Sequence, residues 1–280
     1  LAEDNEANQM VAVELLSRLG IELDIAANGR LAVEMARAHP GRYAAILMDM
    51  QMPEMDGLEA TRIIRGEPAY HDLPILALTA NAMKQDLDAC LDAGMNDHIT
   101  KPIDRAALLA TLRRWLPGKK RGQELLCEAP VGPFRQRFLT SFLPESTGLS
   151  APPVHEQPAG SLRSELSGSR TGDGAPSLDG VDVSGALQRL GLGFDPLRRM
   201  LIRFADGHCK TLDELRAAVS ARDAAGAARV AHAIAGAAGN LGADRLRTAA
   251  RALEHAGREG QTELHEMLRA VETQSGVVLR

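Results

Sequence analysis

Two patterns of hydrophobic residues divide the chain. Up to about residue 117, short apolar runs alternate with stretches in which apolar residues recur every three or four positions. Such runs are typical of strands buried on both faces, and such recurrence is typical of amphipathic helices. Strands that alternate with helices predict an α/β domain with a doubly wound parallel sheet. From about residue 179 onward only the helical period remains, which predicts an all-α antiparallel helical bundle.

Gly, Pro and capping residues mark the expected bounds of each element. In the first region, we expect helices over 8–19, 29–38, 58–65, 84–92 and 104–116, and strands over 21–26, 43–48, 74–79 and 97–100. In the second region, we expect helices over 183–190, 196–221, 224–240, 243–257 and 262–271. Asp223 has the residue type of an N-cap and Gly242 that of a helix break.

Residues 118–178 differ in composition. Pro, Gly and Ser dominate from residue 144 to residue 180, which is typical of a flexible linker. A linker of this length has an r.m.s. reach of about 40–45 Å, so the flanking domains, 1–117 and 179–280, are able to meet within one chain. Phe134, Phe138 and Phe142 are spaced four residues apart, which fits either a short docking helix or a helix extension.

Charge and cysteine content narrow the class of protein. The formal net charge is −5 and the pI is near 5.9, which argues against nucleic acid or a membrane surface as the main partner. No apolar run is long enough to span a bilayer, and the first residues lack a signal peptide's basic region. The three cysteines fit no metal-binding spacing, so we expect reduced thiols and a cytoplasmic location.

Polar side chains with a common chemistry follow the expected strands. They are Glu3, Asp4, Asp49, Thr79 and Lys101. The carboxyl ends of parallel strands meet at one edge, where open α/β sheets place their chemistry. Carboxylate oxygens suit Mg²⁺, and a hydroxyl and an ammonium both serve phosphoryl transfer. Each residue alone also fits an ordinary strand end or turn, but the five together favour phosphoryl transfer to Asp49.

Residues 1–117 resemble the receiver domain of response regulators. The matching segments are Glu3-Asp4-Asn5, Met-Asp-Met-Gln-Met-Pro-Glu-Met-Asp-Gly over 48–57, Leu78-Thr79-Ala80 and Lys101-Pro102. The resemblance implies that Asp49 is the phospho-acceptor, that Thr79 is the switch hydroxyl and that Lys101 supplies the ammonium. It also implies that the domain catalyses its own phosphorylation.

The same resemblance implies a magnesium ion as cofactor. Asp4 and Asp49 would bind it, Glu3 would act mostly through water, and Gln51 would contribute its backbone carbonyl. His98 is a departure, because a Tyr or Phe that moves with the switch usually holds this position. The family's ring movement is therefore in question for this chain.

Receivers open with a hydrophobic strand just before the acidic pair, and here only Leu1-Ala2 of it remains. The family places this strand between the strands over 21–26 and 43–48. Without it, buried backbone groups lose partners at ~1–3 kcal/mol each, against a domain stability of ~5–15 kcal/mol. We therefore expect the receiver in this chain to fold poorly and the parent protein to continue upstream.

A second chemical signal lies in the helix over 224–240. Its inward face carries Val230, Ile234, Ala238 and Leu241, whereas His232 lies on another face with Ala and Gly neighbours. Gly costs ~1 kcal/mol inside a helix, so Gly236 and Gly239 indicate the close approach of a partner. The alternative is an ordinary exposed surface histidine.

The segment from about Asp179 to Val271 resembles the histidine phosphotransfer domain. His232, Gly236 and Gly242 match the family motif, but Ala235 replaces its usual Lys, and Arg229 is the nearest cation that would substitute. The resemblance implies that His232 is a second phospho-acceptor. A neutral imidazole is the form that attacks, and an unperturbed pKa near ~6.5 allows it.

The two resemblances together predict phosphorelay signal transduction by the C-terminal part of a hybrid sensor histidine kinase. Asp49 would exchange a phosphoryl group with His232 or with a partner's His or Asp. No ATP-binding boxes are present, so we expect the histidine kinase core upstream in the parent protein, and another receiver or response regulator as a partner. The alternative is a receiver-controlled helical interaction module without phosphotransfer. A DNA-binding regulator is disfavoured, because the bundle lacks a basic recognition helix.

Overall fold

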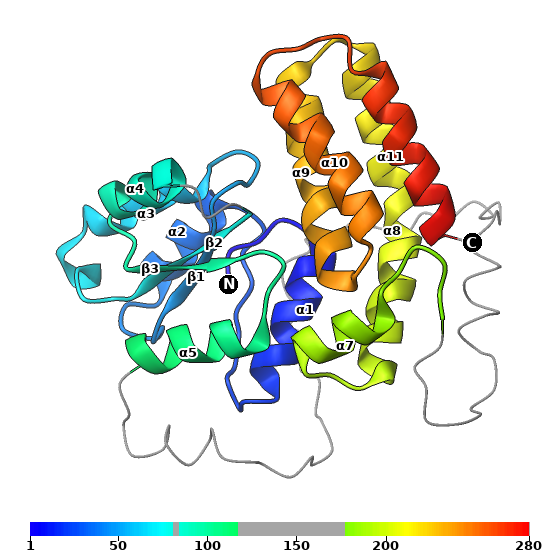
Figure 1. The fold of residues 1–280 in the computed structure, drawn as a ribbon. Helices are drawn as coiled ribbons and strands as arrows, with labels where there is room; N and C mark the ends of the chain where they lie inside the picture. The colour runs from blue at the N-terminus through cyan, green and yellow to red at the C-terminus, as the bar shows by residue number, and fades with distance from the viewer. Residues whose placement is uncertain (81–83, 117–176, 280) are drawn as a thin grey trace, which may run out of the picture.

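The structure is a computed structural model that describes residues 1–80, 84–116 and 177–279 (Figure 1). These residues form a sheet domain (residues 1–116) and a helical bundle (residues 177–279). The phenylalanines at 134, 138 and 142, and nearly all of the linker expected over 118–178, lie outside the described residues.

The sheet domain is built on parallel strands in the order β1-β2-β3. They are β1 (Ile46–Asp49), β2 (Ile75–Thr79) and β3 (Asp97–Thr100). Every residue of β1 and β2 is buried, because helices cover both faces of the sheet. Alternate side chains face opposite layers: Leu47 belongs to the hydrophobic cluster that contains α1 and α5, and Met48 to the cluster that contains α2 and α3.

Capping residues begin the helices of the sheet domain. The helices are α1 (Glu6–Ser17), α2 (Gly29–Ala38), α3 (Gly57–Arg65), α4 (Lys84–Ala93) and α5 (Arg105–Trp115), with a 3₁₀ turn over Pro68–Tyr70. Asn5, Asn28, Asp56 and Asp104 each accept hydrogen bonds from backbone N–H groups of the first turn that follows. The expected bounds of these helices are met to within two residues.

The N-terminal residues occupy the centre of the sheet. Ala2 forms parallel bridges with both Ala26 and Met48, through backbone hydrogen bonds of 2.8–3.0 Å. The strand expected over 21–26 is wrong except at Ala26, because only Leu1 and Ala2 lie beside it as ladder partners. The poor folding expected from this short central strand stays a prediction.

The bundle is all-helical, as expected. Its helices are α7 (Val183–Leu190), α8 (Phe194–Ser220), α9 (Ala224–Leu241), α10 (Asp244–Arg258) and α11 (His265–Val278). Asp223 caps α9 and Gly242 ends it with a left-handed φ of 82°, so both expected boundary residues are confirmed. Among the described residues, no helix has the length and apolar character needed to cross a membrane.

Helix α11 extends seven residues beyond the end expected at Val271. The added turns contain Ser275, Gly276 and paired valines, which are weak helix formers. Val271, Ser275 and Val278 nevertheless lie on one face and are buried against the bundle. Tertiary packing therefore overrides local propensity at this end.

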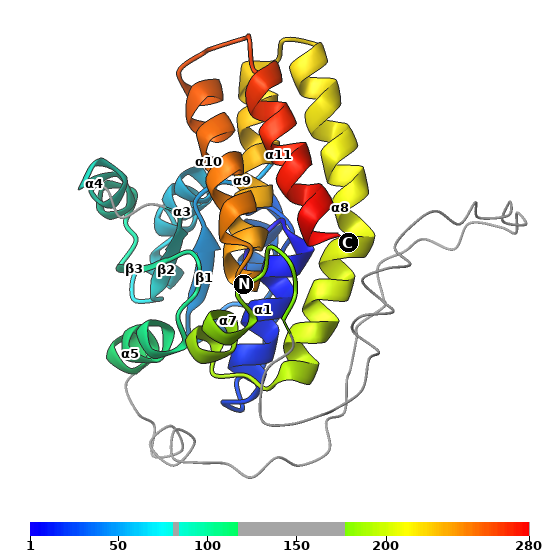
Figure 2. The ribbon, with the colours of Figure 1, turned by 45° about the vertical axis from the view of Figure 1, so that its right-hand side comes forward.

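The two domains are packed together along α1 (Figure 2). Val11 and Leu15 of α1 belong to the same hydrophobic cluster as Leu201 and Phe204 of α8. Polar contacts also cross the junction, since the Arg251 guanidinium donates to the carbonyl of Ala80 at 2.5 Å. The bundle is thus placed over the carboxyl edge of the sheet.

Candidate functional site

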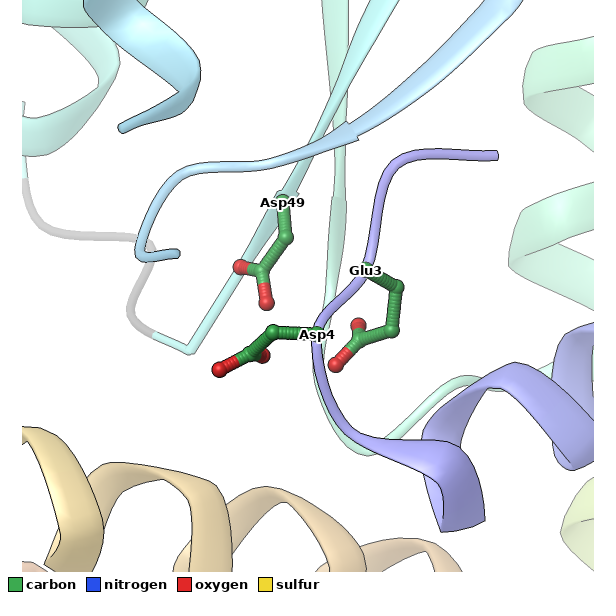
Figure 3. Close-up of side chains that lie close together, drawn as sticks. All are labelled: Glu3, Asp4 and Asp49. Atoms are coloured by element: carbon green, nitrogen blue, oxygen red, sulfur yellow. The ribbon is translucent and has the colours of Figure 1, made fainter. Parts of the chain in front are cut away.

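The expected acidic cluster forms at the carboxyl edge of the sheet. Asp49 ends β1 and Thr79 ends β2, while Lys101 follows β3. Glu3 and Asp4 follow the bridging residue Ala2. Oxygen atoms of Glu3, Asp4 and Asp49 lie within 4.8 Å of one another, and Figure 3 shows their carboxyl groups converging.

Lys101 joins two of these carboxylates. Its Nζ lies 2.6 Å from Asp49 Oδ2 and 2.7 Å from Glu3 Oε2, and all three side chains are 2% exposed. Burial alone would lower the pKa of Lys101, but the two carboxylates hold that pKa above its ordinary value. Lys101 is therefore a permanent cation inside the site.

The cluster carries more negative charge than Lys101 neutralises. Burial and the neighbouring Glu3 raise the pKa of Asp49 to about 7, against the opposing charge of Lys101. Burial and Glu3 likewise raise the pKa of Asp4 to about 6. Oxygen donors that repel one another in this way suit a hard divalent cation such as Mg²⁺.

The surroundings of Glu3 and Asp49 distinguish direct from indirect metal ligands. Glu3 Oε1 accepts a hydrogen bond from Asn8 Nδ2 at 2.8 Å and Oε2 accepts from Lys101, so both of its oxygens have protein partners. Asp49 Oδ1 accepts only a long bond of 3.3 Å from the Gln51 backbone N–H among the contacts described. Asp49 therefore has one carboxylate oxygen that the protein engages less than either oxygen of Glu3.

The loop after Asp49 explains the Asp-Gly pair of the motif. The Asp56 side chain caps α3 by accepting from the Glu59 N–H. A Cβ atom at Gly57 would lie 2.0 Å from the carbonyl oxygen of Asp49, so only glycine permits this approach. Thr79 is buried beside the cluster, whereas His98 is partly exposed, with Nδ1 3.7 Å from Asp97 Oδ1.

His232 is buried rather than exposed, and a carboxylate orients its ring. Its Nδ1 lies 2.8 Å from Glu254 Oε1, which also accepts from the Arg258 guanidinium. Burial would raise the pKa of Glu254, but the hydrogen bond from His232 and the charges nearby bring that pKa below its usual value. An ionised carboxylate only accepts, so Nδ1 carries a proton and donates it to Glu254. Nε2 is buried without a hydrogen-bond partner in the described structure.

His232 and one member of the acidic cluster, Asp4, line the same cleft. The cleft has a volume of about 840 Å³ and is lined by Asp4 and Gln51 of the sheet domain and by Arg229, His232 and Arg258 of the bundle. A positive charge on His232 lowers the pKa of Asp49, an interaction that requires the two side chains to be near each other. The tertiary structure thus brings both predicted acceptors to the same place.

Gly236 and Gly239 permit the close approach of the two domains. A Cβ atom at Gly236 would lie 3.1 Å from Asn8 Nδ2, and one at Gly239 would lie 3.5 Å from Pro102 Cβ and 2.8 Å from Arg247 Cδ. The close approach predicted from these glycines is confirmed. The surface that approaches is the chain's own sheet domain.

Comparison with known families identifies both regions. The family model of the response regulator receiver domain matches residues 1–113, and the model of the Hpt (histidine phosphotransfer) domain matches residues 199–274. The chain contains a receiver domain followed by an Hpt domain. Both are components of two-component phosphorelay systems, so the recognition and the fold class predicted from the sequence are confirmed.

The receiver has relatives in hybrid and two-component proteins. It is 45% identical over 116 residues to "Two-component system protein A" of Emericella nidulans, which covers 41% of this chain and 17% of that protein. It is 40% identical over 116 residues to the "Aerobic respiration control sensor protein ArcB" of Escherichia coli, which covers 41% of this chain and 14% of that protein. The chain therefore spans less than a fifth of the length of these curated relatives.

A solved structure is also similar to the receiver. It is the receiver domain of a sensor histidine kinase from Pseudomonas aeruginosa, with a magnesium ion coordinated in its active site cleft. The identity is 45%, the TM-score is 0.39, and the match covers 42% of this chain and 94% of that chain.

Two Hpt residues near His232, Glu254 and Arg258, were not predicted from the sequence. Glu254 was the missed partner of His232, although a charged residue on the apolar face of α10, between Ala250 and Gly257, was a usable signal. Arg258, one turn later, lines the cleft beside Arg229. Ala235, which stands where the family motif has Lys, is 3% exposed.

Proposed function

We propose that this chain is a phosphorelay segment in which Asp49 of the receiver and His232 of the Hpt domain exchange a phosphoryl group. The observation that carries this proposal is the shared cleft, which Asp4 lines from the receiver and His232 from the Hpt domain. The receiver and Hpt families and the hybrid-kinase relatives support the same role.

The chemistry follows from the protonation states of the two acceptors. The Nε2 lone pair of neutral His232 attacks phosphorus of the Asp49 acyl phosphate, the P–O bond breaks, and its electron pair returns to the Asp49 carboxylate. In the product, Nδ1 of the phosphorylated imidazolium keeps its proton and donates it in a hydrogen bond to Glu254. The negative charge of Glu254 stabilises the positive ring. No other proton has to move, so the reverse transfer uses the same groups.

The receiver supplies the positive charge for the transferred group. Lys101, already bonded to Asp49, faces a phosphoryl oxygen once Asp49 is modified. The Thr79 hydroxyl, at the end of the adjacent strand, is proposed to bond a second oxygen. Mg²⁺ held by Asp4, Asp49 and the Gln51 carbonyl, with Glu3 acting through water, would neutralise the remaining charge.

The Hpt domain contributes a cation from another helix. Ala235 removes the charge that the family motif carries, and its side chain is buried in the Hpt core. Arg258 lies in the cleft and contacts Glu254, so we propose that it takes over the electrostatic role. Arg229 lines the same cleft and is the second source of positive charge.

The wider system follows from the relatives. We propose a receiver over 1–117, a linker over 118–178 and an Hpt domain over 179–280, working with a histidine kinase core upstream in the parent protein and with a further receiver or response regulator. The hybrid-kinase relatives, of which the chain covers less than a fifth, support this view. The unpaired thiols of Cys90 and Cys209 support a cytoplasmic location.

Label transfer within the full chain tests the proposal. The protein is phosphorylated with ³²P-labelled acetyl phosphate and Mg²⁺, and alkali separates labile aspartyl phosphate from stable phosphohistidine. We expect alkali-stable label in the wild type, none in His232→Ala, and none of either kind in Asp49→Asn. Wild-type protein that labels only Asp49 would instead favour the receiver-controlled interaction module.

A further inference from the structure

A buried amide on the Hpt domain reaches into the receiver. Asn240 lies eight residues after His232 on α9, with Gly236 midway, so all three lie along one face of the helix. Asn240 is 0% exposed. Its receiver partner, Asn8 on α1, is 2% exposed and follows the Glu3-Asp4-Asn5 segment in the sequence.

Asn240 uses both ends of its amide across the domain junction. Its Nδ2 donates to Asn8 Oδ1 at 2.9 Å, and its Oδ1 accepts from the backbone N–H of Ile103 at 2.8 Å. One side chain therefore contacts two separate receiver elements, α1 and the segment that follows Lys101. A buried residue that satisfies two partners in this way fixes position as well as orientation.

The path continues from Asn8 to the phosphorylation site. Asn8 Nδ2 donates to Glu3 Oε1 at 2.8 Å, and Lys101 bonds the other oxygen of Glu3 at 2.7 Å and Asp49 at 2.6 Å. Asn240 is thus the Hpt end of an unbroken chain of hydrogen bonds that ends at Asp49.

The Hpt domain holds Asn240 in place and leaves room for Asn8. Arg189 of α7 donates to the carbonyls of Gly239 and Asn240 at 2.8 and 3.1 Å, which fixes the backbone at the end of α9. Gly236 has no side chain where Asn8 approaches. Asn suits position 240, because Asp would set a carboxylate oxygen against the acceptor Asn8 Oδ1, and Ala would leave the Ile103 N–H without its partner.

We propose that Asn240 and Asn8 form a recognition pair that selects this Hpt domain as the receiver's partner and positions Glu3 beside Lys101. The inference rests on the proposed function, because it names the partner and the positioning residues of the same transfer. A second receiver or Hpt domain that lacks either amide fits this junction less well.

The test uses the full chain with Asn8→Ala, Asn240→Ala and the double variant. The control is Asn28→Ala, which removes a receiver amide that bonds Glu54 and caps α2 away from the junction. We expect the Ile103 amide to exchange hydrogen ~10-fold faster in Asn240→Ala, and the control to match the wild type. Label transfer from Asp49 to His232, normalised to label on Asp49, should fall ~10-fold in each single variant and no further in the double.

Asn240→Asp provides a variant of the same size. It keeps an acceptor for the Ile103 N–H, so Ile103 should remain protected while transfer falls as in Asn8→Ala. Thermal melting of every variant, followed by circular dichroism, identifies any that fail to fold.

Two outcomes would overturn the pair: wild-type exchange at Ile103 in Asn240→Ala, or effects of the two single variants that add in the double. Amide exchange does not require phosphotransfer. A wild type that never labels His232 therefore rejects the proposed function, whereas exchange at Ile103 separately decides the contact between the domains.

Discussion

The receiver and Hpt sites differ in where their supporting side chains come from. The carboxylate of Asp49 is surrounded by residues that end neighbouring strands, and Lys101 is bonded to it directly. His232 stands in a helix of small residues, and its orienting carboxylate, Glu254, comes from the next helix. The receiver thus gathers its charged groups around Asp49, whereas the Hpt domain presents an oriented histidine in a cleft that Arg229 and Arg258 also line.

Burial is used differently at the two sites. Glu3, Asp49 and Lys101 form a buried charged group in which Lys101 offsets part of the negative charge of the two carboxylates. His232 needs no balancing charge while it is neutral, because its carboxylate partner is also bonded to Arg258. Removing a charge from the receiver site should therefore destabilise the receiver's fold. Removing a charge from the Hpt site should instead impair phosphoryl transfer.

The largest effect is expected at Lys101. Lys101→Met leaves Glu3 and Asp49 buried without their cation. The free energy of unfolding, measured in urea, should therefore be about 3–5 kcal/mol lower than in the wild type. Lys84→Met, at the exposed start of α4, is the control and should change it by less than about 0.5 kcal/mol. Equal stability of the two variants would show that the buried charges do not depend on Lys101.

A second buried histidine tests whether burial alone makes a histidine functional. His208 bonds Ser275 rather than a carboxylate, with Nε2 2.8 Å from its Oγ, and burial lowers the pKa of His208 to about 4. The unfolded chain, with an ordinary His pKa near ~6.5, binds the proton more readily. Stability contributed by neutral His208 is therefore present above pH ~6.5 and lost as the pH falls toward 4.

Urea unfolding of the wild type and of His208→Gln between pH 7 and pH 4 measures the stability that neutral His208 contributes. The wild type should lose on the order of 3 kcal/mol more than the variant over this interval. Label transfer to His232 at pH 7 should be the same in both proteins. Parallel stability curves would mean that His208 is not the titrating group.

We expect Glu254 to affect the transfer of the phosphoryl group to His232 and not the labelling of Asp49. Glu254→Ala frees the His232 ring to rotate and to exchange tautomers, so transfer from Asp49 should slow ~10–100-fold. Glu254→Gln restores an acceptor for Nδ1–H without the charge and should recover part of the rate. Labelling of Asp49 by acetyl phosphate should not change, and an equal loss of both activities would contradict an orienting role.

The smallest effect is expected at the exposed ion pairs across the junction. Arg203 lies 3.4 Å from Glu6, and both side chains are mostly exposed. Arg203→Ala should alter the transfer rate by less than about threefold, because solvent and salt screen such pairs. A larger loss than in Asn240→Ala would move the main recognition contact from the buried amides to the surface charges.

Local pattern was sufficient for most elements of both domains. Helix α2, strand β3 and helix α7 have the bounds that their apolar period and capping residues predict. The prediction of a strand over 21–26 was wrong, because strand pairing depends on the residues alongside and not on the segment's own hydrophobicity. Helix α11 is longer than expected, because burial of Val278 compensates for weak helix formers.

The sequence alone predicted Asp49 and His232 as phospho-acceptors, and it located the cluster that surrounds Asp49. It did so because parallel strands bring their carboxyl ends to one edge, so the residues after each strand are neighbours whatever the details of packing. Only the tertiary structure revealed Glu254, the Asn8–Asn240 pair and the common cleft. Those contacts depend on how helices pack across sequence separations of 22 and 232 residues. A helical period fixes which face is buried but not which partner lies against it.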